Sequence, residues 1–194
     1  MEFLPEQLYH IYNRGNNKQR IFFDDGNYHF FLRKFCAYLG KYCKLLAYCL
    51  MPNHFHFMIF TNYDLEVGKL NSGIGLLLRT YTRAINIQEQ RCGFLFQQKT
   101  KAKCLNKQGN RTQSYSIDYG ISCLNYIHQN PLKAKLVKKM EDWKYSSFTE
   151  YIGINKNKFC DTEFCYKILD LPPRDLFYKM SYEIVEAKQL SGIL

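Results

Sequence analysis

The first half of the chain alternates between two spacings of hydrophobic residues, and each spacing predicts a different kind of element. Residues 8–13, 44–50 and 54–60 are short runs rich in β-branched, aromatic and other apolar side chains, which is typical of β-strands. A Pro-Asn turn separates the second run from the third, so these two are expected to form a hairpin. A last strand is expected over 94–105, although its middle is polar and basic.

Two helices are predicted where apolar residues recur every three or four positions. The first begins at an N-cap, Asp24 or Asp25, and carries an aromatic stripe over 28–42. The second carries an apolar stripe over 70–85, with Gly93 as its expected C-cap. The resulting order, β-α-β-β-α-β, is the split βαβ or ferredoxin-like arrangement. This is an α+β fold in which a mainly antiparallel sheet carries both helices on one face.

The pattern after residue 105 predicts a loop and then helices. Residues 106–116 are polar and contain glycine, whereas 117–129 has the apolar spacing of a helix. Asn130-Pro131 is expected to end that helix, because proline lacks an N–H and disfavours helical backbone in the residue before it. A new short helix is expected over 132–140.

At 194 residues, the chain is long enough for one domain with an extension. We take 1–150 as that domain and 151–194 as a C-terminal helical extension that is not an independent domain. The sequence contains no internal repeats.

A strong excess of basic residues narrows the class of partner. There are 27 Lys and Arg against 17 Asp and Glu, a formal charge of +10, which predicts a polyanionic partner and most often nucleic acid. An anionic membrane is the rival, but no basic amphipathic helix or transmembrane stretch stands out. The first residues lack a signal peptide, and the eight cysteines include no Cys-x-x-Cys pair. We therefore expect a cytoplasmic protein with reduced thiols and no membrane partner.

His54 and His56 stand directly after the Pro-Asn turn, at the start of a predicted strand. Side chains alternate faces along a strand, so the two imidazoles share one face while Phe55 and Phe57 occupy the other. Two imidazoles on one face can converge on a metal ion or a phosphate. The alternative is that both are polar residues on the solvated face of a half-buried strand.

Tyr126 and Asn130 are four residues apart, so both would project from one face of the predicted helix. A tyrosine hydroxyl can attack phosphorus, although its ordinary pKa of about 10 makes it a weak nucleophile without a metal or base. The Asn130 amide oxygen is a candidate third metal ligand beside the two histidines. Alternatives remain, because any one of 16 tyrosines could be structural and Asn130 before a proline could be an N-cap. His128 is expected to face away from Tyr126.

Two segments together resemble the core motifs of the single-tyrosine HUH transposases, and most closely those of the REP-associated tyrosine transposases. They are Met51-Pro52-Asn53-His54-Phe55-His56 and Tyr126-Ile127-His128-Gln129-Asn130-Pro131. Supporting matches lie at 13–17, 93–97 and 143–147. The resemblance runs from residue 8 to about residue 150 in the family's order, and it says little about the rest of the chain.

The resemblance implies a fold, a metal and a set of roles. The family's fold is the ferredoxin-like one that the hydrophobic pattern predicts independently. His54 and His56, with Phe55 between them, would hold a divalent metal, Mg or Mn, with Asn130 as third ligand and Tyr126 as nucleophile. Family members cut single-stranded DNA beside hairpins, leaving a 5′-phosphotyrosine and a free 3′-OH that later rejoins strands without a nucleotide cofactor. The implied protein is a cytoplasmic, nucleoid-associated transposase, acting as a monomer or a homodimer.

Three basic clusters are the expected DNA contacts: Arg14, Lys18 and Arg20, then Lys99, Lys101 and Lys103, then Lys133 and Lys135. The middle cluster alternates along a predicted strand, so its three lysines would share one face and could follow a phosphate backbone. For any single lysine, the alternative is an ordinary solvated charge.

Two other functions stay open. A non-catalytic protein that binds DNA or RNA hairpins could derive from a transposase, although all four motif residues are present here. A metal-dependent hydrolase that uses water would need a carboxylate near the histidine pair. None lies there in the sequence, although Asp64 or Asp118 could be brought close by folding.

Overall fold

The computed structural model describes residues 2–106, 117–155 and 158–183. Its strands are β1 (Leu8–Arg14), β2 (Cys43–Met51), β3 (His54–Thr61) and β4 (Lys101–Cys104). Its α-helices are α1 (Asp25–Leu39), α2 (Lys69–Gln88), α3 (Ile117–Lys133), α4 (Phe148–Tyr151), α5 (Thr162–Ile168) and α6 (Arg174–Ser181). Two 3-10 turns are η1 (Asn16–Lys18) and η2 (Met140–Asp142). No helix in these ranges is long and apolar enough to cross a membrane.

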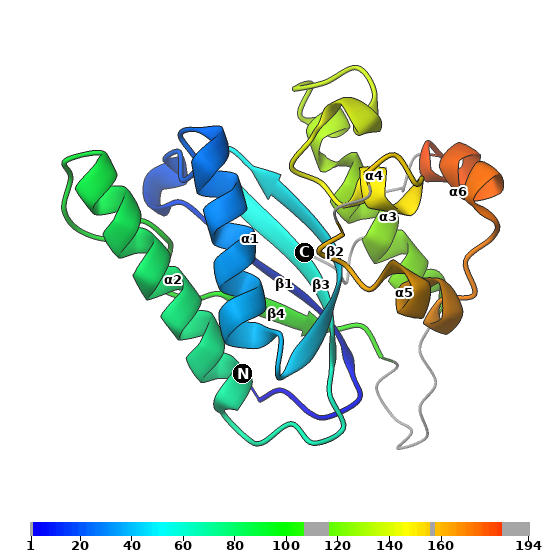
Figure 1. Cartoon of the computed structure of the whole chain (residues 1–194), viewed down its shortest axis with the longest axis horizontal. Coiled ribbons are helices and arrows are strands. Elements are labelled where there is room, and N and C mark those ends of the chain that lie inside the picture. The colour runs from blue at the N-terminus through cyan, green and yellow to red at the C-terminus, as the bar shows by residue number, and fades with distance from the viewer. Residues whose placement is uncertain (1, 107–116, 156–157, 184–194) are drawn as a thin grey trace.

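The four strands form one antiparallel sheet in the order β2-β3-β1-β4 (Figure 1). This order, with α1 and α2 as the two connecting helices, confirms the predicted ferredoxin-like α+β fold. The hairpin of β2 and β3 is confirmed, and so is Asp24 as the N-cap of α1, where its side chain accepts a hydrogen bond from the Asn27 N–H. In the register of the central strands, Tyr12 of β1 faces His56 of β3 on one side and Lys101 of β4 on the other.

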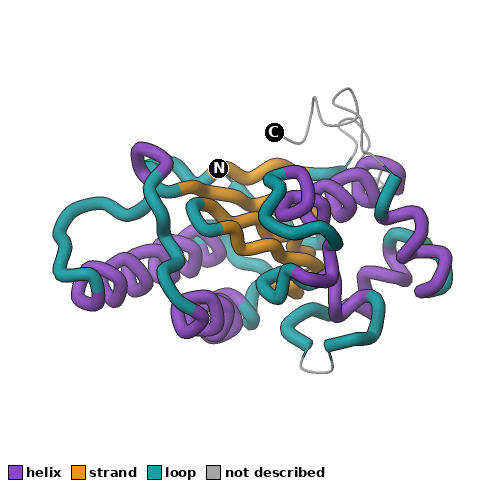
Figure 2. Tube along the Cα trace, turned by 90° about the horizontal axis from the view of Figure 1, so that it is seen from above, coloured by secondary structure: helices purple, strands orange, loops and turns teal. Residues whose placement is uncertain are grey.

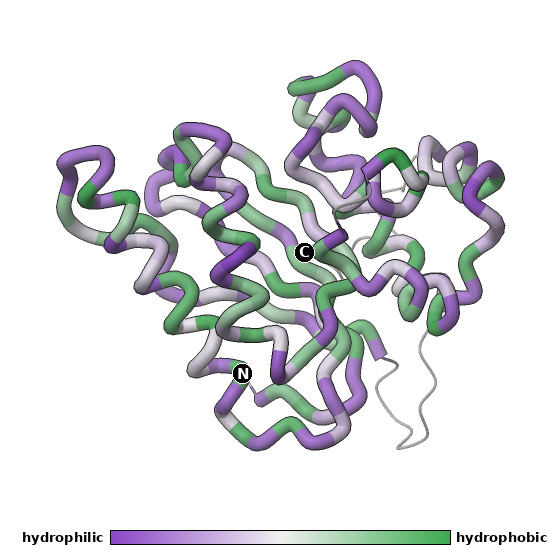
Figure 3. The backbone as a smooth tube through the Cα atoms, viewed as in Figure 1, coloured by the Kyte–Doolittle hydropathy of each residue, from purple (hydrophilic) through white to green (hydrophobic). Residues whose placement is uncertain are grey.

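Both faces of the central strand β3 are largely buried. Phe55, Phe57 and Ile59 belong to a core shared with α1 and α2. Met58 belongs to a second core, shared with α3 and the later helices. Figure 2 shows the strands between these two helical layers, and in Figure 3 the peripheral loops are largely hydrophilic. The face of β3 that carries the two histidines is therefore covered by α3 and not by solvent.

The chain after residue 150 is fastened to β2. The buried Glu150 carboxylate accepts hydrogen bonds from the Tyr48 hydroxyl (3.1 Å) and from the backbone N–H groups of Phe159 (3.1 Å) and Cys160 (3.0 Å). The Asp161 N–H donates to the Leu45 carbonyl at 2.9 Å. Side chains from both sides of residue 150 thus share the second core.

Two predictions about the segment between α2 and β4 are wrong. The helix ends at Gln88 with Glu89 as its C-cap, whereas Gly93 lies in the following loop with a φ of +87°. The last strand covers only Lys101–Cys104, although Phe96 makes a single bridge with Gly15. The Asn13 side chain bonds the Gln97 carbonyl and the Thr100 hydroxyl, so an amide replaces the strand pairing that was expected there.

Pro131 does not end α3, which contradicts the predicted break and the predicted helix over 132–140. The proline occupies the last turn, where the helix continues to Lys133. The Lys135 N–H bonds the Leu132 carbonyl and the Leu136 N–H bonds the Pro131 carbonyl, both at 3.0 Å, while Lys135 has a φ of +56°. This is a Schellman ending with lysine in the left-handed position that glycine usually takes. Asn130 is consequently inside a helix and is not an N-cap. Of the predicted 106–116 loop, only Asn106 lies among the described residues.

His128 lies in the second core and faces away from the cavity that contains Tyr126. Its Nε2 is 2.8 Å from the Ser147 hydroxyl, and its Nδ1 is buried without a hydrogen-bond partner. Burial lowers the pKa of His128 to about 3. Protonation would place an unpartnered charge among the rings of Phe148 and Tyr151.

We therefore predict that His128 makes the protein less stable in acid. The unfolded chain binds a proton near pH 6.5 and the folded chain does not, so the free energy of unfolding should fall by about 2 kcal/mol between pH 7 and pH 5 through this residue. Urea unfolding of His128→Gln should show a loss smaller by about that amount over the same interval. The control is His29→Gln on the exposed face of α1, and equal slopes for wild type and His128→Gln would contradict the prediction.

Candidate active site

His54, His56 and Tyr126 line one cavity of about 370 Å³, which we call the histidine cavity. The histidines come from β3 and the tyrosine from α3, and Tyr12 of β1 lies beside them. The rings of His56 and Tyr126 meet edge to face, with centroids 5.4 Å apart. The two predicted motifs therefore converge on one place, although they are distant in the sequence.

His56 is not a solvated surface residue, because it is only 3% exposed. Its Nδ1 lies 2.9 Å from Nε2 of His10, a histidine on β1. Its own Nε2 is buried and has no hydrogen-bond partner. Burial, followed by the nearby His10 and His54, holds the pKa of His56 well below its usual value. The imidazole is thus neutral, and leaving Nε2 without a partner is unfavourable by about 1–3 kcal/mol.

His54 is half-buried at the start of β3, and its neighbour fixes its tautomer. Its Nδ1 donates to the Asn53 side-chain oxygen at 2.7 Å, which leaves Nε2 as the nitrogen with a lone pair. Burial lowers the pKa of His54, a hydrogen bond with Asn130 opposes this shift, and the charge of Arg14 adds to it. Both histidines of the pair are therefore neutral at pH 7 and each can offer Nε2.

Asn130 lies between the histidine pair and Tyr126. Its Nδ2 donates to the Tyr126 backbone carbonyl at 2.8 Å, and its side chain lies close enough to His54 and to the Tyr126 hydroxyl to shift the pKa of both. Burial raises the pKa of Tyr126 to about 12, and the bond to Asn130 opposes that shift. Both residues project from one face of α3, as their four-residue spacing predicts.

These donors fit a divalent metal ion. Both imidazoles are neutral, and each has its Nδ1 hydrogen-bonded to a neighbouring side chain, which is the usual arrangement for histidine ligands. The Nε2 of His56 has no hydrogen-bond partner, so its lone pair is available to a metal ion. The described residues contain no group of three or more His, Cys, Asp or Glu side chains placed as ligands. Among the side chains next to the pair, Asn130 carries a neutral oxygen that could serve as a third ligand.

No carboxylate lines the histidine cavity in the part of the chain that the structure describes. Asp64 is exposed in the loop after β3, and Asp118 lines a separate cavity beside Phe177. The residue that a water-activating hydrolase would need is therefore absent from the described lining.

The predicted basic residues differ in how they face the histidine cavity. Arg14, Lys18, Lys99 and Lys101 line it, and Lys133 reaches over the Tyr126 ring at 5.8 Å. Lys103 pairs with His10 across the sheet, one step further along the same face. Arg20 is bonded to the Phe22 and Phe23 carbonyls and lines another cavity, of about 450 Å³, with His54, while Lys135 lies just after the end of α3.

Sequence reasoning missed His10 and Tyr12. Their alternation along β1 indicates that they share a face, but nothing local reveals which strand lies beside them. The pairing of Tyr12 with His56 depends on register, which brings His10 within hydrogen-bond distance of His56.

Comparisons with known proteins support the fold. No family model and no curated protein matches the sequence. A solved structure of a REP-associated tyrosine transposase bound to a REP hairpin is similar to the chain, with a TM-score of 0.61 and 15% identity, over 81% of this chain and 86% of that one. At this identity the likeness concerns the arrangement of the elements.

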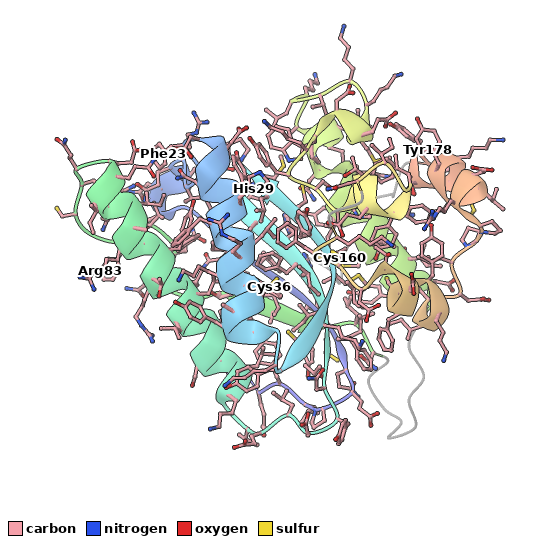
Figure 4. All side chains as sticks on the ribbon, viewed as in Figure 1. Phe23, His29, Cys36, Arg83, Cys160 and Tyr178 are labelled. Carbon is pink, nitrogen blue, oxygen red and sulfur yellow. The ribbon has the colours of Figure 1, made fainter. Side chains whose placement is uncertain are left out.

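We predict that His10 positions His56 as a ligand. His10→Leu removes the partner of His56 Nδ1, so the affinity for Mn²⁺, measured by calorimetric titration, should fall about 10–100-fold. His10→Gln should recover part of the loss, because an amide can replace the hydrogen bond. The matched control is His29→Leu on the outer surface of α1 (Figure 4), which should bind Mn²⁺ like the wild type. Wild-type affinity in folded His10→Leu would refute the role.

Proposed function

We propose that the protein is a metal-dependent endonuclease and strand transferase that cuts single-stranded DNA beside hairpins through Tyr126. The observation that carries the proposal is that Tyr126 lies beside the two neutral histidines of β3 in a cavity lined by basic residues, with Asn130 of the same helix face next to His54. A structural tyrosine would need none of these neighbours. The fold shared with a hairpin-bound tyrosine transposase supports the same class of activity.

The chemistry assigned to Tyr126 is a reversible transesterification. Its hydroxyl oxygen forms a bond to the scissile phosphorus while the bond from phosphorus to the 3′ oxygen breaks. The proton lost by the tyrosine balances the one gained by the departing 3′-OH. Attack by a 3′-OH on the phosphotyrosine reverses these changes and joins strands, so no nucleotide cofactor is required.

The raised pKa of Tyr126 means that its hydroxyl needs help to lose its proton at neutral pH. The hydrogen bond from Asn130 and the ammonium of Lys133, 5.8 Å from the ring centroid, both favour the phenolate. His54, His56 and Asn130 are the residues that would hold a divalent ion, Mg or Mn. When bound, that ion would supply Lewis-acid polarisation of the phosphate. The basic residues of the cavity would orient the DNA backbone.

The decisive test is covalent capture. Wild-type protein is incubated with labelled single-stranded hairpin DNA and Mn²⁺ and separated on a denaturing gel. We expect a protein–DNA band that disappears with chelator and is lost in Tyr126→Phe, because phenylalanine cannot form the phosphoester. Tyr63→Phe is the matched control, since Tyr63 is 80% exposed in the loop after β3, and it should retain the band.

Other outcomes assign other functions. Strand cleavage that survives in Tyr126→Phe without a covalent band would indicate hydrolysis by water. Retention of hairpins with neither cleavage nor a band would indicate a non-catalytic hairpin-binding protein.

A further inference from the structure

A second and larger cavity lies on the outer side of α2. It has a volume of about 760 Å³ and is formed by the C-terminal half of α2 and the loop over 91–98 that follows it. We call it the arginine groove after Arg79, Arg83 and Arg91, which line it. In Figure 4 the Arg83 side chain projects from α2 on the side away from α1. The chemistry proposed for Tyr126 makes no use of this groove.

The charge of the groove is positive and unneutralised. Its lining includes no Asp or Glu, and the ion pairs found among the described residues involve lysines only. Arg79 and Arg83 are four residues apart and therefore share one face of α2. One turn earlier stands Gly75, where a Cβ atom would lie 3.0 Å from Arg79 Nη1. Glycine thus leaves room for the guanidinium to lie along the helix.

An exposed aromatic ring stands in the same groove. Phe94 is 74% exposed and Ile87 is 70% exposed, and both line this groove, so its apolar surface is contiguous. The backbone on either side of the ring is nevertheless fixed. The Gln19 side chain donates to the carbonyls of Phe94 (3.1 Å) and Leu95 (2.8 Å), and Asn86 donates to that of Gly93 (2.9 Å). The ring is therefore presented to solvent on a rigid support.

The arginine groove adjoins the histidine cavity at Gln97. Gln97 lines both of them, and its backbone N–H bonds the carbonyl of Arg14, which also lines the histidine cavity. A DNA strand held beside Tyr126 would therefore need to pass only Gln97 to reach the groove.

We propose that the arginine groove binds a single-stranded DNA segment that continues from the strand held beside Tyr126. Arginines that contact phosphates, combined with an aromatic ring that stacks on an unpaired base, are the usual means of holding unpaired nucleic acid. The groove supplies both, and its rigid backbone reduces the entropy lost on binding. The link to the strand beside Tyr126 rests on the proposed function, whereas the positive charge of the groove and its exposed ring are independent of that function.

The test compares two DNA probes by fluorescence anisotropy. One is a blunt hairpin, and the other is the same hairpin with an unpaired flank of about ten nucleotides, placed on either side in turn. For the flanked probe, Phe94→Ala should weaken binding about tenfold through lost stacking. The double variant Arg79→Gln/Arg83→Gln should weaken binding to the flanked probe. It should also make the slope of log affinity against log salt shallower by about 1.4, because each of the two lost phosphate contacts accounts for about 0.7.

The controls separate this proposal from general effects and from the proposed function. Arg33→Gln, an exposed charge on α1, should bind both probes like the wild type, and the groove variants should bind the blunt hairpin unchanged. The proposal would be overturned if the groove variants lost equal affinity for both probes. It would also be overturned if their affinity and salt slope for the flanked probe were unchanged, which is the result expected if the groove binds a protein. If binding depends on the unpaired flank but no covalent protein–DNA band forms, the proposed nuclease function is refuted, and single-stranded DNA remains the ligand of the groove.

Discussion

Burial of both faces of β3 is the constraint on which the rest of the structure depends. Alternation sends Phe55 and Phe57 into the core under α1 and α2, so the histidines must face the layer formed by α3. Because α3 covers that face, His56 is buried with one nitrogen bonded to His10 and the other orphaned, while His54 at the end of the strand is half-buried. The same packing that stabilises the sheet therefore holds two neutral histidines ready for a ligand.

The end of α3 completes this arrangement. Because Pro131 is accommodated in the last turn, Tyr126 and Asn130 remain on one uninterrupted helical face. The Schellman ending at Lys135 satisfies the last carbonyls without glycine, and Ala134 and Leu136 on either side of it line a cavity with His54. The helix terminus is thus packed beside the β2–β3 turn, which brings the tyrosine to the histidines.

Side-chain amides recur where ordinary strand or helix pairing stops. Asn13 bonds the segment before β4, Asn53 orients His54, Asn130 bonds the Tyr126 carbonyl within the last turns of α3, and Gln19 supports the backbone of Phe94. An amide can donate and accept without carrying charge, so it can fix a loop beside a basic cavity without neutralising it. This explains how the two cavities keep their positive lining and remain ordered.

The sequence by itself determined the element order, the sheet with its hairpin and the pairing of His54 with His56, because these follow from local periodicity of two or of 3.6 residues. It also indicated that Tyr126 and Asn130 share a helix face. Only the tertiary structure decided that His10 and Tyr12 lie beside the histidine pair. It also decided that Gly93 is not a helix cap and that Pro131 does not end α3. Strand register, the coverage of a second sheet face and the end of a helix depend on contacts between distant segments, which no local pattern encodes.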